Sequence, residues 1–171
     1  MYKYILLSVV LAISTILASF SSFSDDANRQ VIVVDNLQNV AKLAKLKKLP
    51  VMIFFAAEDC EFCDALEADY LSAMSLAEEY NNKVIIRKVM IDAYEDVYDF
   101  QGKNISTEDF SRYFKVRVTP TLLLVDYRGD ALTRKIIGYN RSGFFGAYLD
   151  EAIDEANRKI RTEKVSVLHQ N

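Results

Sequence analysis

Residues 51–63 read VMIFFAAEDCEFC, and this stretch decides the fold. Residues 51–57 are apolar without interruption, which is typical of a strand buried on both faces of a sheet. Cys60 and Cys63 follow this run directly. Over 61–80 apolar residues recur at helical spacing, so we expect one helix that begins after Cys60 and leaves Glu67 off its apolar side. A buried strand that leads into a helix therefore presents the cysteine pair.

Further strands are predicted on both sides of this stretch. Runs rich in β-branched and other apolar residues indicate strands at 31–34, 83–92, 122–125 and 132–139. The last two flank the turn 126–129, which is the arrangement of an antiparallel hairpin. Residues 93–105 show only a weak pattern, and we interpret them as a loop or a short helical insert.

Apolar residues at helical spacing predict further helices. Asn36 is the expected N-cap of one, and Ser106 begins a pattern that resembles a capping box and opens a second. A third covers 145–160 and is followed by a frayed tail after Thr162. Strands that alternate with helices and include one hairpin predict an α/β protein, with a central mixed sheet flanked by helices.

The cysteine pair points to redox chemistry. The chain has 2 cysteines, and a disulfide between Cys60 and Cys63 closes a very small loop that adds little stability. A helix N-terminus favours the thiolate, and it lowers a thiol pKa from about 8.5 to about 3.5–7.5 in known Cys-x-x-Cys sites. We therefore predict that Cys60 is the nucleophile. Cys63, one turn inside the helix, is predicted to resolve the mixed disulfide.

Metal or haem binding is the rival interpretation of this spacing. A structural zinc site needs four ligands, and beyond its cysteines the chain offers the single histidine His169. Covalent haem needs a histidine directly after the second cysteine, where this chain has Asp64. We expect neither a resident metal nor another cofactor. The two thiolates of the reduced pair can hold a copper ion, so a metal carrier stays an alternative.

The N-terminal residues have the order of a secretory signal peptide. A lysine precedes an apolar stretch, 5–17, and small residues follow it. The stretch is shorter than the ~18–20 residues of a membrane span, so we favour a cleaved signal over a retained anchor. Cleavage after Ser24 fits best, and cleavage after Ser21 is the alternative. A signal peptide of residues 1–24 and a periplasmic domain of residues 25–171 are predicted.

Charge and composition limit the partners. The chain has 21 Lys and Arg residues against 24 Asp and Glu, for a net charge of −3, and no long run of one sign occurs. We therefore expect no nucleic-acid partner. No heptad pattern argues for obligate assembly, so we expect a monomer. An oxidising compartment makes disulfide-containing exported proteins the expected substrates.

Several motifs together resemble a known family. VMIFFAAEDCEFC, the later VTPT at 118–121, LLLVDYRGD and IIGY resemble the thioredoxin superfamily, in particular its exported thioredoxin-like members of the sulfur-oxidation (SoxW) type. The resemblance implies the thioredoxin fold and a thiol:disulfide oxidoreductase. The expected role is to reduce or exchange disulfides with electrons from a membrane-bound donor. A disulfide oxidase or isomerase, and a redox-sensitive binding module or metal carrier, stay as alternatives.

The resemblance also implies how substrates bind. It implies that Pro120 is cis and lies against the disulfide, because a cis peptide bond is costly except before proline. The backbone of Thr119 is then left to pair with an extended substrate segment. Phe62, between the cysteines, is either a contact for apolar substrate segments or a packing residue.

Two departures from the family pattern bear on proton transfer and redox direction. The buried Asp of thioredoxin's central strand aligns with Phe54, so proton relay by that residue is absent. Glu58 or Asp64 would assist proton transfer from the resolving thiol, unless both are solvated acids near a helix start. Asp59 and Glu61 flank the nucleophile with negative charge, which opposes its ionisation and favours a reducing or exchange role.

Overall fold

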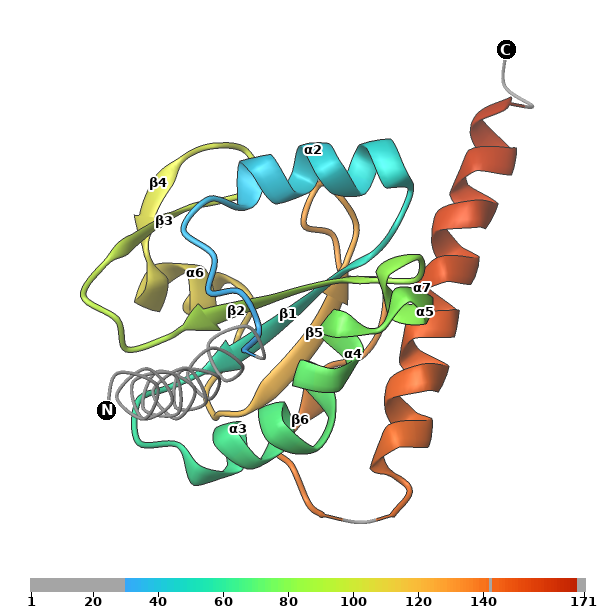
Figure 1. Cartoon of the computed structure of the whole chain (residues 1–171). Helices are drawn as coiled ribbons and strands as arrows, with labels where there is room; N and C mark the ends of the chain where they lie inside the picture. Colours follow the sequence, from blue (N-terminus) through green and yellow to red (C-terminus); the bar gives the residue numbers. More distant parts are fainter. Residues whose placement is uncertain (1–29, 142, 169–171) are drawn as a thin grey trace, which may run out of the picture. The chain divides into compact units, whose positions relative to one another are not determined.

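A computed structural model of the chain describes residues 30–141 and 143–168 (Figure 1). The predicted signal peptide, residues 1–24, and His169 lie outside the described residues. All elements discussed below belong to the part of the chain that begins at Val31.

The core of the fold is a mixed four-stranded sheet with the order β2-β1-β5-β6. Its strands are β1 (Val51–Ala56), β2 (Ile85–Met90), β5 (Thr121–Val125) and β6 (Ile136–Ile137). β1 pairs parallel with β2 and antiparallel with β5, and β5 pairs antiparallel with β6. Every residue of β1 is buried, because the sequence VMIFFA carries no polar side chain that would need water. The predicted α/β fold with a central mixed sheet is confirmed.

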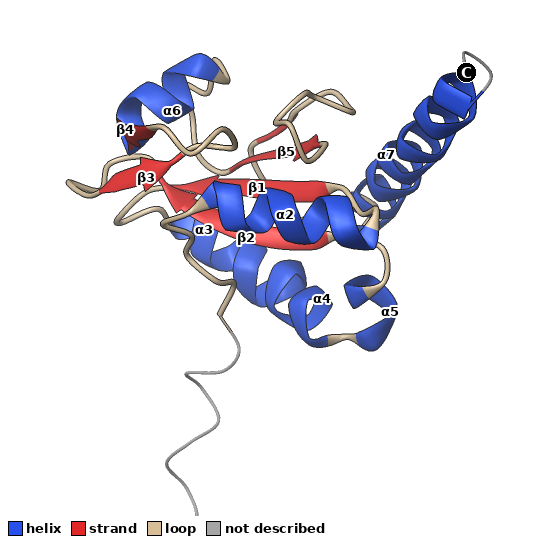
Figure 2. Ribbon diagram, turned by 90° about the horizontal axis from the view of Figure 1, so that it is seen from above, coloured by secondary structure: helices blue, strands red, loops and turns tan. Residues whose placement is uncertain are grey.

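Helices cover both faces of this sheet, as Figure 2 shows. Successive side chains of a strand point to opposite faces, and two apolar clusters result. Phe55 of β1 belongs to the cluster under α2 (Leu37–Lys47) and α6 (Thr107–Tyr113). Phe54 belongs to the cluster on the other face, which includes residues of the cysteine helix and of α7 (Phe145–Leu168). The cysteine helix therefore packs on one definite face of the central strand.

The helix caps follow the sequence signals. The Asn36 side chain accepts a hydrogen bond from the Asn39 N–H at 3.0 Å, which confirms the predicted N-cap of α2. The Ser106 hydroxyl accepts one from the Asp109 N–H at 3.1 Å and caps α6 in the same way. Local side-chain chemistry was sufficient to place both helix starts.

The single helix predicted over 61–80 is wrong. The structure divides it into α3 (Glu61–Leu66), a π-helical turn η1 (Glu67–Leu71), α4 (Ser72–Leu76) and α5 (Glu78–Asn81). The Ser72 N–H donates to the Glu67 carbonyl, five residues back, and this wider turn rotates the following residues relative to a regular α-helix. Ala77 is extended, with ψ 126°, which separates α4 from α5. Glu67 itself is buried and not, as predicted, off the apolar side, because it lies on the helix face that also buries Cys63 and Leu66.

Three other segments also differ from the expectation. The segment 93–105, predicted as a loop or short helical insert, together with Ser106 forms a hairpin of β3 (Asp96–Tyr98) and β4 (Asn104–Ser106). Val97 is fully buried and anchors a short strand that its local pattern does not reveal. The predicted strand 31–34 is reduced to one bridge between Val33 and Lys88. Of the predicted strand 132–139, only β6 forms. Ala131, the residue before this range, makes a single bridge to Val125.

The chain closes with α7, which runs on to Leu168 and so past the frayed end predicted at Thr162. Its predicted apolar stripe is buried at Phe145, Leu149 and Ile153. In the part of the chain that the structure describes, no helix combines the length and the apolar character needed to cross a membrane.

Candidate functional site

Cys60 and Cys63 form a disulfide at the start of α3, with 5.2 Å between their Cα atoms. Cys60 is the N-cap residue, and its carbonyl accepts hydrogen bonds from the N–H groups of Cys63 at 2.8 Å and Asp64 at 3.1 Å. Its sulfur also accepts the Cys63 N–H at 3.3 Å. A backbone donor of the first helical turn is therefore directed at the Cys60 sulfur, where it stabilises negative charge.

The two sulfur-bearing residues differ in exposure. Cys63 is 3% exposed and belongs to the apolar cluster beneath the helix, whereas Cys60 is half-buried and packs at its border. A substrate disulfide can approach Cys60 from solvent, and Cys63 is reached only through Cys60. This asymmetry fits the order of attack expected from the sequence.

The loop before Cys60 is held by the neighbouring strand. The Glu58 N–H donates to both oxygens of Asp92, at 3.2 and 2.9 Å, and the Ile91 N–H donates to the Ala56 carbonyl at 2.8 Å. Asp59 has a φ of 51°, in the left-handed region. The sequence reasoning missed Asp92. Its position directly after a strand parallel to β1 was the available signal, because the ends of parallel strands meet at one edge.

The Thr119–Pro120 segment lies at the same edge of the sheet. Thr121, which begins β5, pairs with Phe55 near the end of β1, so the antiparallel register brings residues 119–120 beside the loop that leads to Cys60. The Thr119–Pro120 peptide bond is cis. Pro120 is buried, and its carbonyl accepts the Gly138 N–H at 2.8 Å. Within the described residues, no partner is found for the Thr119 backbone N–H.

The other predicted site residues are exposed. Phe62 is 62% exposed, so it is not a core packing residue. Glu58 and Asp64 are both exposed, and neither side chain has a hydrogen-bond partner within the described residues. The structure therefore places Phe62 where a partner could touch it, and it leaves the two acids in solvent.

A buried ion pair near the cysteines was missed entirely. Glu67 is 8% exposed, and its Oε2 lies 2.6 Å from the Nζ of Lys88. Its Oε1 accepts the Val31 N–H, also at 2.6 Å. The Lys88 Nζ stands 6.0 Å from the centre of the Phe54 ring. A lysine at a core-facing position of a buried strand was the available signal, because such a charge needs an acidic partner.

Two tyrosines tie the helical layer to neighbouring segments. The Tyr139 hydroxyl donates to Asp69 of η1 at 2.6 Å, and burial together with this hydrogen bond raises the pKa of Tyr139 to about 12. The Tyr80 hydroxyl donates to Asp150 of α7 at 2.7 Å, and this bond, with burial, raises the pKa of Tyr80 to about 12. These two bonds connect the helical segment that follows the cysteines to Tyr139 and to α7.

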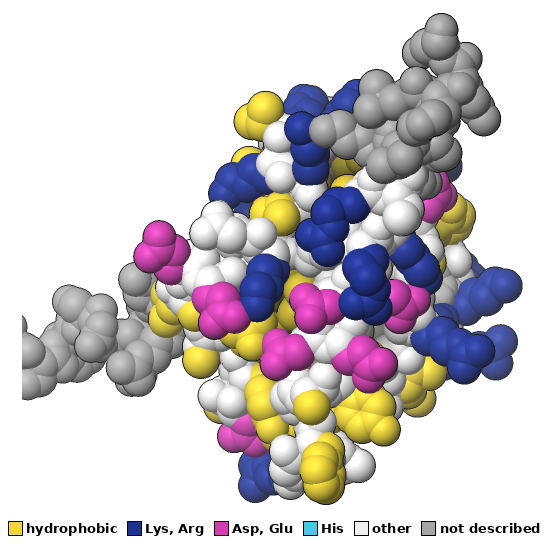
Figure 3. Space-filling view, turned by 90° about the vertical axis from the view of Figure 1, so that its right-hand side faces the viewer, with side chains coloured by type: hydrophobic (Ala, Val, Ile, Leu, Met, Phe, Trp, Pro, Cys, Tyr) yellow, Lys and Arg dark blue, Asp and Glu magenta, His cyan; other side chains and the backbone are white. Residues whose placement is uncertain are grey.

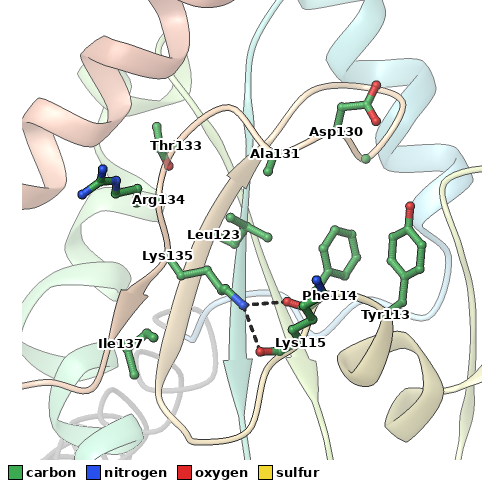
Figure 4. A pocket seen from close by; sticks show the side chains of 11 residues that line it. Tyr113, Phe114, Lys115, Leu123, Asp130, Ala131, Thr133, Arg134, Lys135 and Ile137 are labelled. Atoms are coloured by element: carbon green, nitrogen blue, oxygen red, sulfur yellow. Dashed lines mark hydrogen bonds between the residues drawn. The ribbon is translucent and has the colours of Figure 1, made fainter.

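A surface pocket of about 550 Å³ lies elsewhere, between the hairpin 129–137 and the end of α6 (Figure 4). Lys135 reaches across it and donates to the carbonyls of Phe114 and Lys115 at 2.8 and 2.9 Å. This contact joins the segment before β6 to the end of α6. Neither cysteine lines this pocket.

Metal ligands do not gather around the cysteines. No group of three or more His, Cys, Asp or Glu side chains that could hold a metal ion occurs within residues 30–141 and 143–168. On the face that carries α7, basic and acidic side chains are interspersed (Figure 3).

A mixed sheet, covered by helices on both faces and carrying a cysteine pair at a helix start, defines a protein of the thioredoxin fold with a redox-active site. The chain belongs to the thioredoxin-like domain family, whose model matches residues 37–153. This fold and the Cys60–Cys63 disulfide together support a thiol:disulfide oxidoreductase.

Solved structures are similar to the chain in fold. Thioredoxin from Fasciola hepatica is 19% identical, with a TM-score of 0.51, and the match covers 74% of this chain and 99% of that one. Thioredoxin F from spinach chloroplast is 21% identical, with a TM-score of 0.50, and the match covers 75% and 94% of the two chains. No match was found among the curated proteins.

Proposed function

We propose that the protein is a periplasmic thiol:disulfide oxidoreductase that reduces or exchanges disulfides in exported proteins. The observation that carries the proposal is the contact of the Cys63 N–H with the Cys60 sulfur at 3.3 Å, combined with the burial of Cys63. A half-buried sulfur that faces helix-start donors is suited to attack, and a buried neighbour is suited to release the product.

The reaction has two exchange steps. The Cys60 thiolate attacks one sulfur of a substrate disulfide, whose other sulfur leaves as a thiolate, and a mixed disulfide forms. The Cys63 thiolate then attacks the Cys60 sulfur, and the bond to the substrate breaks. The substrate departs reduced, and the protein is left with the Cys60–Cys63 disulfide seen in the structure. An electron donor must then reduce this disulfide, and we assign that role to a membrane-bound protein.

Charge around the nucleophile supports the reducing direction. Asp59, Glu61 and Asp64 are all exposed close to Cys60, and the two residues between the cysteines carry no positive charge. Negative neighbours disfavour the Cys60 thiolate. The reduced form is therefore stabilised less than in a strong oxidant, in which a stable thiolate favours the reduced state. A reduction potential near the ~−120 mV of a strong periplasmic oxidase would overturn this direction and favour the oxidase.

Substrate contacts at the edge of the sheet follow from the same geometry. The Thr119 backbone N–H is available to an extended segment, and the exposed ring of Phe62 follows the nucleophile by two residues in the chain. We assign these groups and Pro120 to substrate binding. On the face that carries α7, acidic side chains are interspersed with the basic ones, which argues against nucleic acid as a partner there (Figure 3). A signal peptide at 1–24, a monomeric state and kinship with the sulfur-oxidation (SoxW) type complete the proposal.

The test is reduction of insulin disulfides by the wild type, Cys60→Ser and Cys63→Ser. Loss of activity to the background is expected for Cys60→Ser, because the remaining thiol, that of Cys63, is 3% exposed and so is shielded from a substrate disulfide. Cys63→Ser should stall with its substrate bound to Cys60, so mixed disulfides captured from the periplasm identify the clients. Activity that survives in Cys60→Ser would exclude catalysis by this pair. A redox-sensitive binding module or metal carrier would then be the better interpretation.

A further inference from the structure

Glu67 lies one helical turn beyond the resolving cysteine, on the same face of the helix. The Glu67 N–H donates to the Cys63 carbonyl, so the spacing between these residues is that of an α-helix. Residues four apart on a helix have Cβ atoms about 5–6 Å from each other. Helical side chains also lean toward the N-terminus, so the Glu67 carboxylate covers the turn that holds Cys63. Both residues are buried, at 8% and 3% exposure.

Two donors reach the Glu67 carboxylate, the ammonium of Lys88 and the Val31 N–H. Lys88 comes from β2, and β1, the strand beneath the helix, contributes only apolar side chains. A carboxylate oxygen pair offers about four acceptor positions, so capacity for a further proton donor remains. Buried ion pairs are weak contributors to stability relative to apolar residues of similar volume. Packing alone is therefore an insufficient explanation of this pair.

Cys63 must lose its proton before it can attack the Cys60 sulfur. The acids nearest in sequence, Glu58 and Asp64, are exposed, whereas Cys63 faces the core. Asp64 follows Cys63 directly, and consecutive helical residues do not face each other. Glu67 is the acid that shares both the face and the burial of the resolving thiol.

Building on the proposed function, we infer that Glu67 accepts the proton of Cys63 during resolution, with Lys88 as the positioning residue that holds the carboxylate in place. The Cys63 thiol gives its proton to the Glu67 carboxylate, and the resulting thiolate attacks the Cys60 sulfur. The bond between Cys60 and the substrate sulfur breaks, and the departing thiolate takes the proton. The dithiol is oxidised to the disulfide, and the substrate disulfide is reduced.

A coloured disulfide reagent separates the two steps. When reduced protein reacts with dithiobis(nitrobenzoate), attack by Cys60 releases the first nitrothiobenzoate ion, and resolution by Cys63 releases the second. In Glu67→Gln the first release should keep its rate, and the second should slow by about 10²-fold, the contribution typical of one general base. The second release should also rise more steeply with pH than in the wild type, because hydroxide must replace the carboxylate. A substitution that only alters core packing does not make the rate of the second release depend more steeply on pH.

Matched variants keep the outcome decisive. Glu79→Gln removes an acid from a Glu–Lys pair of the same 2.6 Å length at the surface, and it should leave both releases unchanged. Glu67→Leu combined with Lys88→Met removes the charges but fills the space, so it should fold, checked by circular dichroism, and still resolve slowly. A normal second release in folded Glu67→Gln, or a slow one in Asp64→Asn alone, would overturn the inference. A first release that persists in Cys60→Ser would instead refute the proposed function.

Discussion

The first and second turns of the cysteine helix carry the same kind of side chain in opposite environments. Glu61 and Asp64 in the first turn are exposed, whereas Glu67 in the next turn is buried with Lys88 and the Val31 N–H as partners. Water screens the first two charges, and the third interacts at close range in a medium of lower dielectric constant. The enclosure around a carboxylate, and not its type, therefore determines how strongly it acts on stability and on the neighbouring thiols.

The largest expected effect on the free energy of unfolding comes from removing the buried acid, Glu67. Glu67→Ala leaves the Lys88 ammonium and the Val31 N–H without their partner, so we expect a loss of about 3–5 kcal/mol in the free energy of unfolding. Asp64→Ala removes only a favourable charge near a helix start and should cost about 0.3–1 kcal/mol. Urea unfolding of the oxidised proteins measures both. Equal losses in the two variants would mean that burial does not distinguish these acids.

The second effect concerns the pH dependence of stability that results from Tyr139, whose hydroxyl binds η1. Tyr139 donates to Asp69 of η1, and burial together with this hydrogen bond raises its pKa from the ordinary 10.0 to about 12. Between these values the unfolded chain loses its tyrosine proton while the folded protein keeps it, so stability is full below about pH 10 and falls as the pH rises toward 12. Tyr139→Phe should reduce this alkaline loss.

Thermal unfolding of the wild type and Tyr139→Phe at a series of pH values measures the difference. Tyr80→Phe is the matched variant, since the pKa of Tyr80 is also raised to about 12 by its contact with Asp150. Each substitution should remove part of the decline. An unchanged slope above pH 10 in both variants would show that neither hydroxyl is held in its neutral form by the fold.

The smallest effect belongs to the exposed first turn. Phe62→Ala should change the free energy of unfolding by no more than about 0.5 kcal/mol, because the ring is 62% exposed. If substrates touch the ring, loss of about 1 kcal/mol of apolar contact raises the KM for insulin roughly fivefold. Leu46→Ala, at an 80% exposed position of α2 on the opposite face, is the control. Equal KM values for all three proteins would remove Phe62 from the substrate contacts.

Local signals predicted much of the fold and the place of the cysteines. The apolar run of β1 has no alternative to burial, and Asn36 and Ser106 cap their helices through bonds within three residues. The position of Cys60 at a helix start depends only on the strand before it and the helix after it. These features were predictable because each rests on neighbours in the chain.

Features that depend on distant partners were not predictable in this way. Helical periodicity of 3.6 residues placed Glu67 off the apolar side, but in the fold its carboxylate is buried and binds the distant partners Lys88 and Val31. The hairpin β3–β4 exists because Val97 is buried against the rest of the fold, and not because its own residues favour strands. In both cases a contact across many residues overrides the local pattern.

Asp59 shows how backbone shape limits the residues that can precede the nucleophile. Its φ of 51° is tolerated by glycine, asparagine and aspartate, and it is unfavourable for branched or bulky side chains. The tethering of this loop by Asp92 leaves little freedom to relieve such a conflict. The loop geometry thus disfavours branched and bulky side chains directly before the nucleophile, and this limit applies before any demand of catalysis is considered.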